Sequence, residues 1–250
     1  IVPITDLTIK DNSLIVATQG RSIWMLDDLT VIHQLSSSVD EEKLYKPKDS
    51  YRMRGSGGRK SLTAGTNLPN GVIIHYFLPS FDNESDEVKL SIHSEDGSLI
   101  KEFSNKSKEN SMKVEKGGNS FVWNMKYPGA KRLDKMVLWG ADFSGAKAVP
   151  GDYIVKLKVN EKELTQDFTI HKDPTSEGSI EDIKAQFEFV NEINGVVADA
   201  HNAIENIRKI KNDLNKFQSD YADNESAKNL INESKLIFES IDIIENELYQ

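Results

Sequence analysis

The apolar residues of this chain change their spacing near Ser179, and this change separates two kinds of structure. After Ser179 they recur about every 3.6 residues, up to Phe217 and again after a polar break at 219–224. Ser179 followed by Asp182 resembles a capping box, which marks the first turn of a helix. The pattern therefore predicts two long helices that fold back on each other as an antiparallel hairpin over 179–250.

Before residue 172 the chain consists of short β-rich runs bounded by turn residues, and in Val88–Ser94 and Tyr153–Val159 apolar residues alternate with polar ones, as in β-strands with one buried face. In the range 71–172 the runs of this kind are Val72–Leu78, Val88–Ser94, Leu99–Phe103, Phe121–Met125, Tyr153–Val159 and Glu163–Ile170. Asp96-Gly97 between two of them is a strong hairpin signal. About seven short strands over such a length predict a β-sandwich.

Residues 1–35 contain three or four further strands, each closed by turn residues. They are Thr5–Lys10, Leu14–Thr18, Ser22–Leu26 and, as an optional fourth, Val31–Leu35. Such a meander has the size of one propeller blade. A sheet this small is only marginally stable in water, so we expect it to pack against another part of a protein.

The range 36–70 is polar and rich in Ser and Gly, and we interpret it as a linker. Its basic stretch from Lys43 to Lys60 has two interpretations. It binds an acidic partner, or it is tethered to the acidic remainder of the chain.

Charge and composition exclude several classes of protein. The chain is 38% hydrophobic and 28% charged, which suits a folded core, and its formal net charge is -9. The negative charge argues against nucleic acid and against an anionic membrane surface as partners. There is no cysteine, which excludes disulfides and thiolate metal sites. No run reaches the roughly 20 apolar residues of a membrane span.

Both ends of the chain interrupt a pattern. Ile1 is not a methionine and already leads into a strand, and the helical pattern still runs at Gln250. We therefore expect the C-terminal part of a longer protein, with a truncated hairpin at its end.

One run carries a specific resemblance. Ala17–Leu29 reads A-T-Q-G-R-S-I-W-M-L-D-D-L. It resembles the last blade of bacterial sortilin-like propellers, which are also described as bacterial-neuraminidase-repeat or glycosyl-hydrolase-like proteins. Tyr45–Arg52 (Y-K-P-K-D-S-Y-R) and the stretch from Asn67 to Pro79 are similar to the segments that follow the propeller in that family.

The middle of the chain has a second resemblance. Val88–Ile100, Gly118–Asn124 and Ala148–Tyr153 are similar to the Ig-like repeat of flagellar-hook-capping and surface proteins. Together the resemblances imply an exported protein that is secreted, periplasmic or associated with the outer membrane. They also imply that any active site lies in an upstream propeller, outside this chain.

The residues themselves suggest no chemistry. The histidines lack the spacing of metal ligands, and they are His33, His75, His93, His171 and His201. The carboxylate-rich run Asp82–Glu87 lacks the alternation of a calcium loop. We therefore predict no catalytic, cofactor-binding or metal-binding residue in this chain.

Two residues are candidates for a contact surface. Trp139 lies in the long loop Tyr127–Val149, where an aromatic face would suit a sugar or a protein. Arg21 follows Gly20 at a strand turn and either points to the propeller or pairs with Asp27 or Asp28. Trp24 and Trp123 lie in strand patterns, and we expect both in a core.

The expected fold is a multi-part α and β protein. It consists of a terminal β-propeller blade (1–35), a linker (36–70), an Ig-like β-sandwich (71–172) and a long antiparallel helical hairpin (179–250). The expected function is non-catalytic: the chain braces the missing N-terminal propeller and contacts partner proteins in a periplasmic, outer-membrane or secretion-associated assembly. Two alternatives remain, an accessory part of a secreted carbohydrate-active hydrolase with its active site upstream, and a module that binds glycan.

Overall fold

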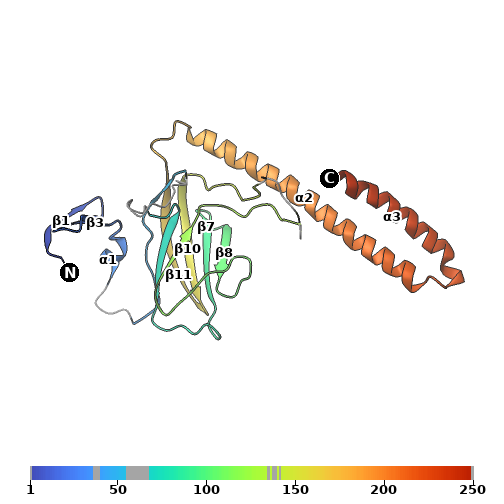
Figure 1. Ribbon diagram of the computed structural model, residues 1–250, viewed down its shortest axis with the longest axis horizontal. Coiled ribbons are helices and arrows are strands. Elements are labelled where there is room, and N and C mark those ends of the chain that lie inside the picture. The colour runs from blue at the N-terminus through green and yellow to red at the C-terminus, as the bar shows by residue number, and fades with distance from the viewer. Residues whose placement is uncertain are drawn as a thin grey trace. The chain divides into compact units, whose positions relative to one another are not determined.

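The computed structural model describes residues 2–35, 40–54, 68–133, 136, 140 and 142–248. Strands and helices occupy separate parts of the chain (Figure 1). The chain divides into two compact units, Ile1–Tyr127 with Lys147–Lys184 and Pro128–Ala146 with Ala185–Gln250. The prediction of a multi-part protein with several sheets and a C-terminal helical hairpin is confirmed.

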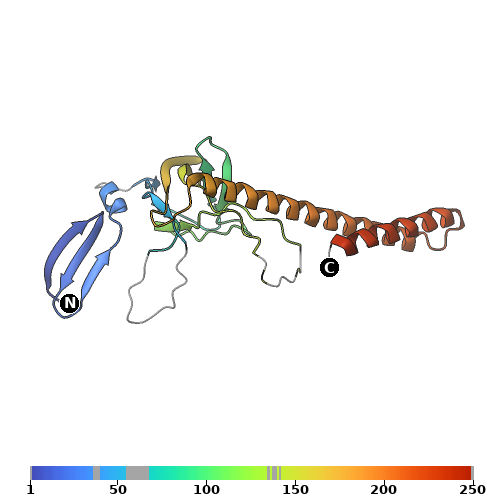
Figure 2. The same cartoon turned by 90° about the horizontal axis from the view of Figure 1, so that it is seen from above.

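The first unit begins with a three-stranded antiparallel sheet, called here the small sheet (Figure 2). Its strands lie in the order β1 (Ile4–Lys10), β2 (Ser13–Thr18) and β3 (Ile23–Leu26). Asp11 and Asn12 join β1 to β2 with φ angles of 50° and 62°. Two left-handed residues twist the chain as a tight hairpin needs, so the turn lies where the sequence predicts it.

A short helix, α1 (Thr30–Gln34), stands where the sequence allowed a fourth strand. The Asp28 carboxylate accepts a hydrogen bond from the Thr30 N–H at 2.9 Å, which starts the helical turn. Leu29 beside it is buried. The optional strand at Val31–Leu35 is therefore wrong, because a turn at Asp28 leads the chain directly into a helix.

The rest of the first unit contains two larger sheets, called here the two-sheet region. One has the order β5-β11-β10-β7-β8, from Ser50–Arg52, Lys162–Lys172, Gly151–Val159, Val88–Ser94 and Leu99–Ser104. The other has the order β4-β6-β9, from Lys43–Leu44, Val72–Leu78 and Gly117–Trp123. All neighbours are antiparallel except β5, which pairs parallel with β11.

Both larger sheets contribute to one hydrophobic core. Along β6 every second residue from Val72 to Leu78 is buried, as expected for a strand with one face on a core. Trp123 at the end of β9 is fully buried and packs edge-on against Tyr153 and Phe168. This core gives the two-sheet region its own support.

The range 36–70, interpreted from the sequence as a linker, contributes two strands to these sheets. β4 pairs with β6, and β5 pairs with β11. Residues 36–39 and 55–67 of this range lie outside the described part of the chain. Strands of two and three residues are too short to produce a readable alternation, so composition alone suggested a loop.

The helical hairpin consists of α2 (Ile180–Asp220), a short 3₁₀ turn η1 (Glu225–Ala227) and α3 (Lys228–Leu248). The predicted capping box is present. The Ser179 hydroxyl accepts from the Asp182 N–H at 3.0 Å, and the Asp182 carboxylate accepts from the Ser179 N–H at 2.9 Å. In the part of α2 and α3 that the structure describes, no stretch is long and apolar enough to cross a membrane.

Candidate functional site

The small sheet has apolar side chains on both faces. Residues paired across strands share a face, so the register places on one face Leu7, Ile9, Leu14, Val16, Trp24 and Leu26. The opposite face carries Ile15, Ala17, Ile23 and Met25, together with Asp6, Thr8 and Lys10. Strands of a sheet that faces water on one side normally alternate apolar and polar side chains, and β1 does so, whereas β2 and β3 are apolar on both faces.

The apolar side chains of β1 and β3 are exposed to solvent, and those of β2 are half-buried. Trp24 is 62% exposed, and every residue of β1 and β3 is exposed. Burial of apolar surface stabilises by roughly 25 cal/mol per Å². The small sheet therefore lacks most of the stabilisation by apolar burial that the two-sheet region has. Both of its faces are suited to contact with another surface.

The prediction that Trp24 lies in a core is wrong for this chain, whereas Trp123 is buried as predicted. The Trp24 indole N–H donates to the Arg21 carbonyl at 2.9 Å, which holds the ring on the surface of the sheet. A strand pattern shows which side chains are apolar. It does not show whether the same chain covers them.

Arg21, one of the two predicted contact residues, is exposed at the turn before β3. Within the described residues no ion pair joins it to Asp27 or Asp28. Asp28 instead accepts a hydrogen bond from the Asn12 side chain at 3.1 Å. The Arg21 side chain is therefore available at the rim of the small sheet. Trp139, the other predicted contact residue, lies outside the described residues.

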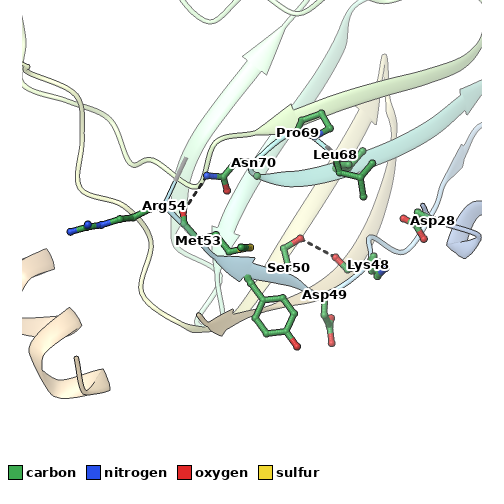
Figure 3. A pocket seen from close by; sticks show the side chains of 12 residues that line it. Asp28, Lys48, Asp49, Ser50, Met53, Arg54, Leu68, Pro69 and Asn70 are labelled. Carbon is green, nitrogen blue, oxygen red and sulfur yellow. Dashed lines mark hydrogen bonds between the residues drawn. The ribbon is translucent and has the colours of Figure 1, made fainter. Parts of the chain in front are cut away.

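A pocket of about 440 Å³ lies beside β5 (Figure 3). Two of its polar side chains bind the main chain of the pocket wall. The Asn70 amide donates to the Met53 carbonyl at 3.1 Å, and the Ser50 hydroxyl donates to the Lys48 carbonyl at 3.3 Å. Neither side chain is paired there with a base that would activate it, so the pocket has the chemistry of a structural cleft.

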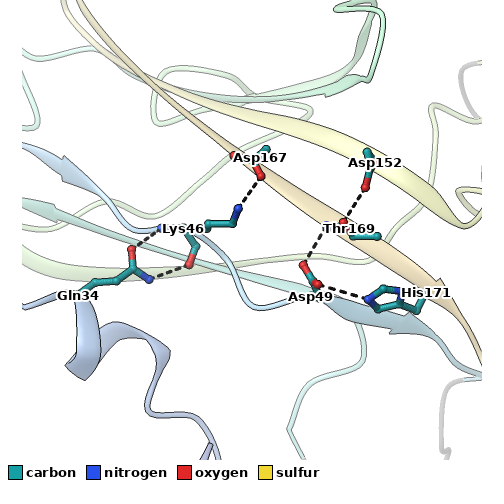
Figure 4. Close-up of polar contacts among 7 residues, drawn as sticks. All are labelled: Gln34, Lys46, Asp49, Asp152, Asp167, Thr169 and His171. Carbon is teal, nitrogen blue, oxygen red and sulfur yellow. Dashed lines mark hydrogen bonds and ion pairs between the residues drawn. The ribbon is translucent and has the colours of Figure 1, made fainter.

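A set of polar contacts fastens the segment before β5 to its neighbours (Figure 4). The Gln34 amide of α1 binds the main chain of Lys46 in both directions, with distances of 2.8 and 3.0 Å. Lys46 then pairs with Asp167 of β11 at 2.5 Å, which raises the pKa of Lys46 and lowers that of Asp167. At Lys46, the internal tether is the interpretation of the basic stretch that the contacts favour.

Asp49 continues this set of contacts. Its carboxylate accepts from the Thr169 N–H at 3.2 Å and lies 3.3 Å from His171 Nε2 (Figure 4). A His–Asp pair is one part of a catalytic triad, but a triad also needs a nucleophile on the other ring nitrogen. Among the described residues none occupies that position. We therefore interpret the Asp49–His171 pair as a bond between β5 and β11.

Two partly buried cations hold the loops at the end of these strands. Arg52 Nε donates to the Ala148 carbonyl at 3.0 Å, and Lys147 Nζ donates to the Met53 carbonyl at 2.5 Å. Burial lowers the pKa of both groups, and Arg52 lowers that of Lys147 further. Both side chains are engaged with the main chain, which is a structural role.

The part of the chain that the structure describes holds no group of three or more His, Asp or Glu side chains placed to bind a metal ion. The sequence did not identify Gln34 and Asp49 as residues that fasten α1 and the segment before β5 to the larger sheets, whereas Lys46 belongs to the basic stretch for which an internal tether was one interpretation. The K-P-K-D stretch within 45–52 was identified as a resemblance and as part of the basic stretch, but its partners Asp167 and Thr169 lie more than a hundred positions away in the sequence. In comparisons with known proteins, no family model matches the chain and no curated relative matches it either.

Proposed function

We propose that this chain is the non-catalytic C-terminal region of an exported sortilin-like propeller protein. In this proposal residues 1–35 complete the propeller as its last blade. The two-sheet region and the hairpin brace the propeller and contact partner proteins in a periplasmic, outer-membrane or secretion-associated assembly.

The observation that carries the proposal is the exposure of apolar side chains on both faces of the small sheet. A propeller blade stands between neighbouring blades, which are arranged radially and leave only short edges free. A sheet that is apolar on both faces suits that position. The resemblance of Ala17–Leu29 to the last-blade motif supports the same role independently.

We also propose that the two-sheet region is an Ig-like sandwich. The Tyr153 hydroxyl donates to the Val149 carbonyl, four residues upstream, at 2.6 Å. A tyrosine bonded back to the upstream main chain recurs in Ig-like sandwiches, as does a buried tryptophan such as Trp123. Burial raises the pKa of Tyr153, so the hydroxyl stays a donor across the physiological range.

Bracing requires a firm connection between blade and sandwich. The double hydrogen bond between Gln34 and Lys46 supplies one, because it joins α1 to the segment that enters the larger sheets. Lys43 adds a bond from its ammonium group to the Gln34 carbonyl at 2.5 Å.

The proposal is tested by one substitution made in two proteins. Ile9 of β1 and Leu99 of β8 are 63% and 58% exposed, so each is changed to Gln in this chain and in a longer chain that includes the upstream propeller. In this chain we expect neither Ile9→Gln nor Leu99→Gln to change the free energy of unfolding. In the longer chain Ile9→Gln should cost about 1.5–3 kcal/mol, because a neighbouring blade buries Ile9. Equal, negligible effects of both substitutions in the longer chain would refute the proposal.

A further inference from the structure

The hairpin has an apolar seam on each helix, made of residues spaced alternately by three and four positions. On α2 the seam consists of Phe189, Ile193, Val196, Ala200, Ala203, Ile207, Ile210, Leu214 and Phe217. On α3 it consists of Leu230, Ser234, Ile237, Ile241, Ile244 and Leu248. This spacing is the heptad pattern by which helices pack side by side, with the seam residues at positions a and d. Position a is occupied by Ile193, Ala200, Ile207 and Leu214 on α2 and by Ser234, Ile241 and Leu248 on α3, and the other seam residues are at position d.

The two seams lie on the same face of the hairpin. α3 runs antiparallel to α2 (Figure 1), and the helices are joined by Arg208 and Lys211 to Glu245 at 2.7 Å each. Lys211 directly follows the seam residue Ile210, and Glu245 directly follows the seam residue Ile244. Each helix therefore faces the other with the flank that lies on the C-terminal side of its seam residues, the position of the next residue in the sequence. In an antiparallel pair this arrangement turns both seams to one side.

Most of that side is exposed, although Ser234 is buried and accepts a hydrogen bond from Gln218 of α2. Half-buried seam residues are Ala200, Ala203, Ile207, Leu214, Phe217 and Ile241. Large seam side chains exposed to solvent are Phe189, Ile193, Val196, Ile210, Leu230, Ile237, Ile244 and Leu248. Lys131 contacts another side of α2, where its ammonium group binds Asn202 and Glu205 and its carbonyl binds His201. The seams thus form an open apolar strip along one side of the hairpin, called here the groove, which is long enough for a third helix. Glu245 pairs with Arg208 and α3 ends at Leu248, so the N-terminal seam residues Phe189, Ile193 and Val196 extend this strip along α2 alone.

The charges that border the groove all have one sign. The outer border of each helix is formed by the residues that directly precede position a. They are Glu192, Asp199, Asn206 and Asp213 on α2, and Glu233, Ser240 and Glu247 on α3, all exposed. None of these carboxylates pairs with a cation among the described residues. The hairpin lysines Lys209, Lys216 and Lys235 lie on sides of their helices away from the seam.

We propose that this groove binds an amphipathic helix of a basic partner protein, one whose apolar stripe is bordered by Lys or Arg. Residues beside a heptad seam form the interhelical ion pairs that select a partner, and two acidic borders select basic ones. A second copy of the hairpin would bring acidic borders together, and an anionic membrane surface would be repelled. The inference rests on the proposed function in that it treats the hairpin as a protein-contact part.

The test uses two synthetic helical peptides of about four heptads, with Leu at positions a and d and either Lys or Glu at positions e and g. Binding to this chain is measured by fluorescence anisotropy of labelled peptide. We expect the Lys peptide to bind at least about ten-fold more tightly than the Glu peptide, a difference of about 1.4 kcal/mol. Added salt should reduce the difference, because the border charges are exposed.

Matched variants separate the groove from general attraction to an acidic protein. Glu233→Lys changes a border charge, and Glu239→Lys makes the same change on α3 away from the groove. Ile237→Asp and Leu236→Asp change neighbouring residues that are 51% and 64% exposed, of which only Ile237 belongs to the seam. Circular dichroism confirms that each variant remains helical. Glu233→Lys and Ile237→Asp should weaken binding of the Lys peptide several-fold, while Glu239→Lys should have a smaller effect and Leu236→Asp little effect.

Four results would overturn the inference. The Glu peptide binds as well as the Lys peptide, or the paired variants have equal effects. The chain sediments as a dimer that Ile237→Asp dissociates, which makes a second copy the occupant. The chain binds phosphatidylglycerol vesicles through Ile237, which makes the occupant a membrane. None of these experiments involves the propeller, so the role of the small sheet is tested separately.

Discussion

β1 of the small sheet and β6 of the two-sheet region are both seven residues long and lie in antiparallel sheets, yet their exposure is opposite. Residues of β6 alternate between buried and half-buried, whereas all residues of β1 are exposed. The difference lies in what faces each strand. β6 faces a second sheet that shares its core, and no second layer of described residues covers β1. The apolar side chains of a strand indicate that it is stabilised by packing against another layer. They do not indicate whether that layer belongs to the same chain.

The hairpin combines both situations. Its inner flank is closed by ion pairs among Arg208, Lys211, Asp242 and Glu245, while its seam stays open. The two-sheet region is thus complete by itself, and the small sheet and the hairpin seam present surfaces for others. Substitutions in each of these parts measure this contrast through their effects on stability.

The largest effect is expected for truncation of a buried tryptophan. Trp123→Ala should lower the free energy of unfolding of the two-sheet region by about 3–5 kcal/mol, because it empties the centre of the core. Trp24→Ala removes the same side chain from the exposed small sheet and should change stability by less than about 0.5 kcal/mol. Urea denaturation followed by far-ultraviolet circular dichroism gives both values. Similar losses for the two variants would mean that the small sheet is as self-supporting as the core.

Backbone packing provides a second contrast, within the two-sheet region. Gly71 has a φ of +153°, and a Cβ there would lie 2.4 Å from the Trp123 carbonyl oxygen. Gly97 has a φ of +84° in the Asp-Gly turn, with no atom within 4 Å of an added Cβ. Gly71→Ala should therefore cost about 3 kcal/mol from overlap and strain, and Gly97→Ala about 1 kcal/mol from strain alone. Thermal melts of the two variants would contradict this if Gly97→Ala proved the more damaging.

A smaller effect is expected for the closed flank of the hairpin. Hydrogen bonds from Lys211 and Arg208 lower the pKa of Glu245. A carboxylate with a lowered folded pKa adds stability above its unfolded value, near 4.3, and loses it as the pH falls through the folded value. We expect hairpin stability to be level above about pH 5 and to fall below it.

The matched variants for this prediction are Glu245→Gln and Glu239→Gln. Glu245→Gln should cost about 1 kcal/mol at pH 7 and reduce the acid dependence, since Asp242 keeps its own bond to Lys211. Glu239→Gln, outside the cluster, should leave the profile unchanged. Helicity measured from pH 3 to 8 would argue against the ion-pair origin if both variants behaved like the original chain.

The sequence predicted the regular elements whose pattern runs long enough to be read. Val72–Leu78 and Val88–Ser94 are strands with the predicted bounds, and the hairpin begins at Ser179 with its capping box. It missed β4, β5 and α1, which have two, three and five residues. Elements this short depend on distant partners, which a local pattern does not contain.

The candidate sites were harder to predict for a related reason. Arg21 was identified from its place at a turn, and the structure leaves it exposed. Gln34 and Asp49 were not identified, because each acts on residues brought close only by the fold, Lys46 for one and Thr169 for the other. The exposure of Trp24 was not foreseen either, because a strand pattern reads the same whether or not another layer covers the strand.

The smallest effect concerns the bond between the two kinds of region. Gln34→Ala removes the acceptor of the Lys46 N–H, which lies 2.8 Å from the Gln34 side-chain oxygen. Global stability should hardly change, but the Lys46 amide should exchange with solvent about five-fold faster, the effect of one lost hydrogen bond of about 1 kcal/mol. Gln166→Ala is the control, because its amide binds the Leu44 carbonyl and leaves the Lys46 N–H in place. Amide exchange is measured by NMR. An unchanged exchange rate of the Lys46 amide in Gln34→Ala would mean that this hydrogen bond does not hold α1 to the segment before β5. The proposed bracing of the small sheet would then need contacts other than the Gln34–Lys46 pair.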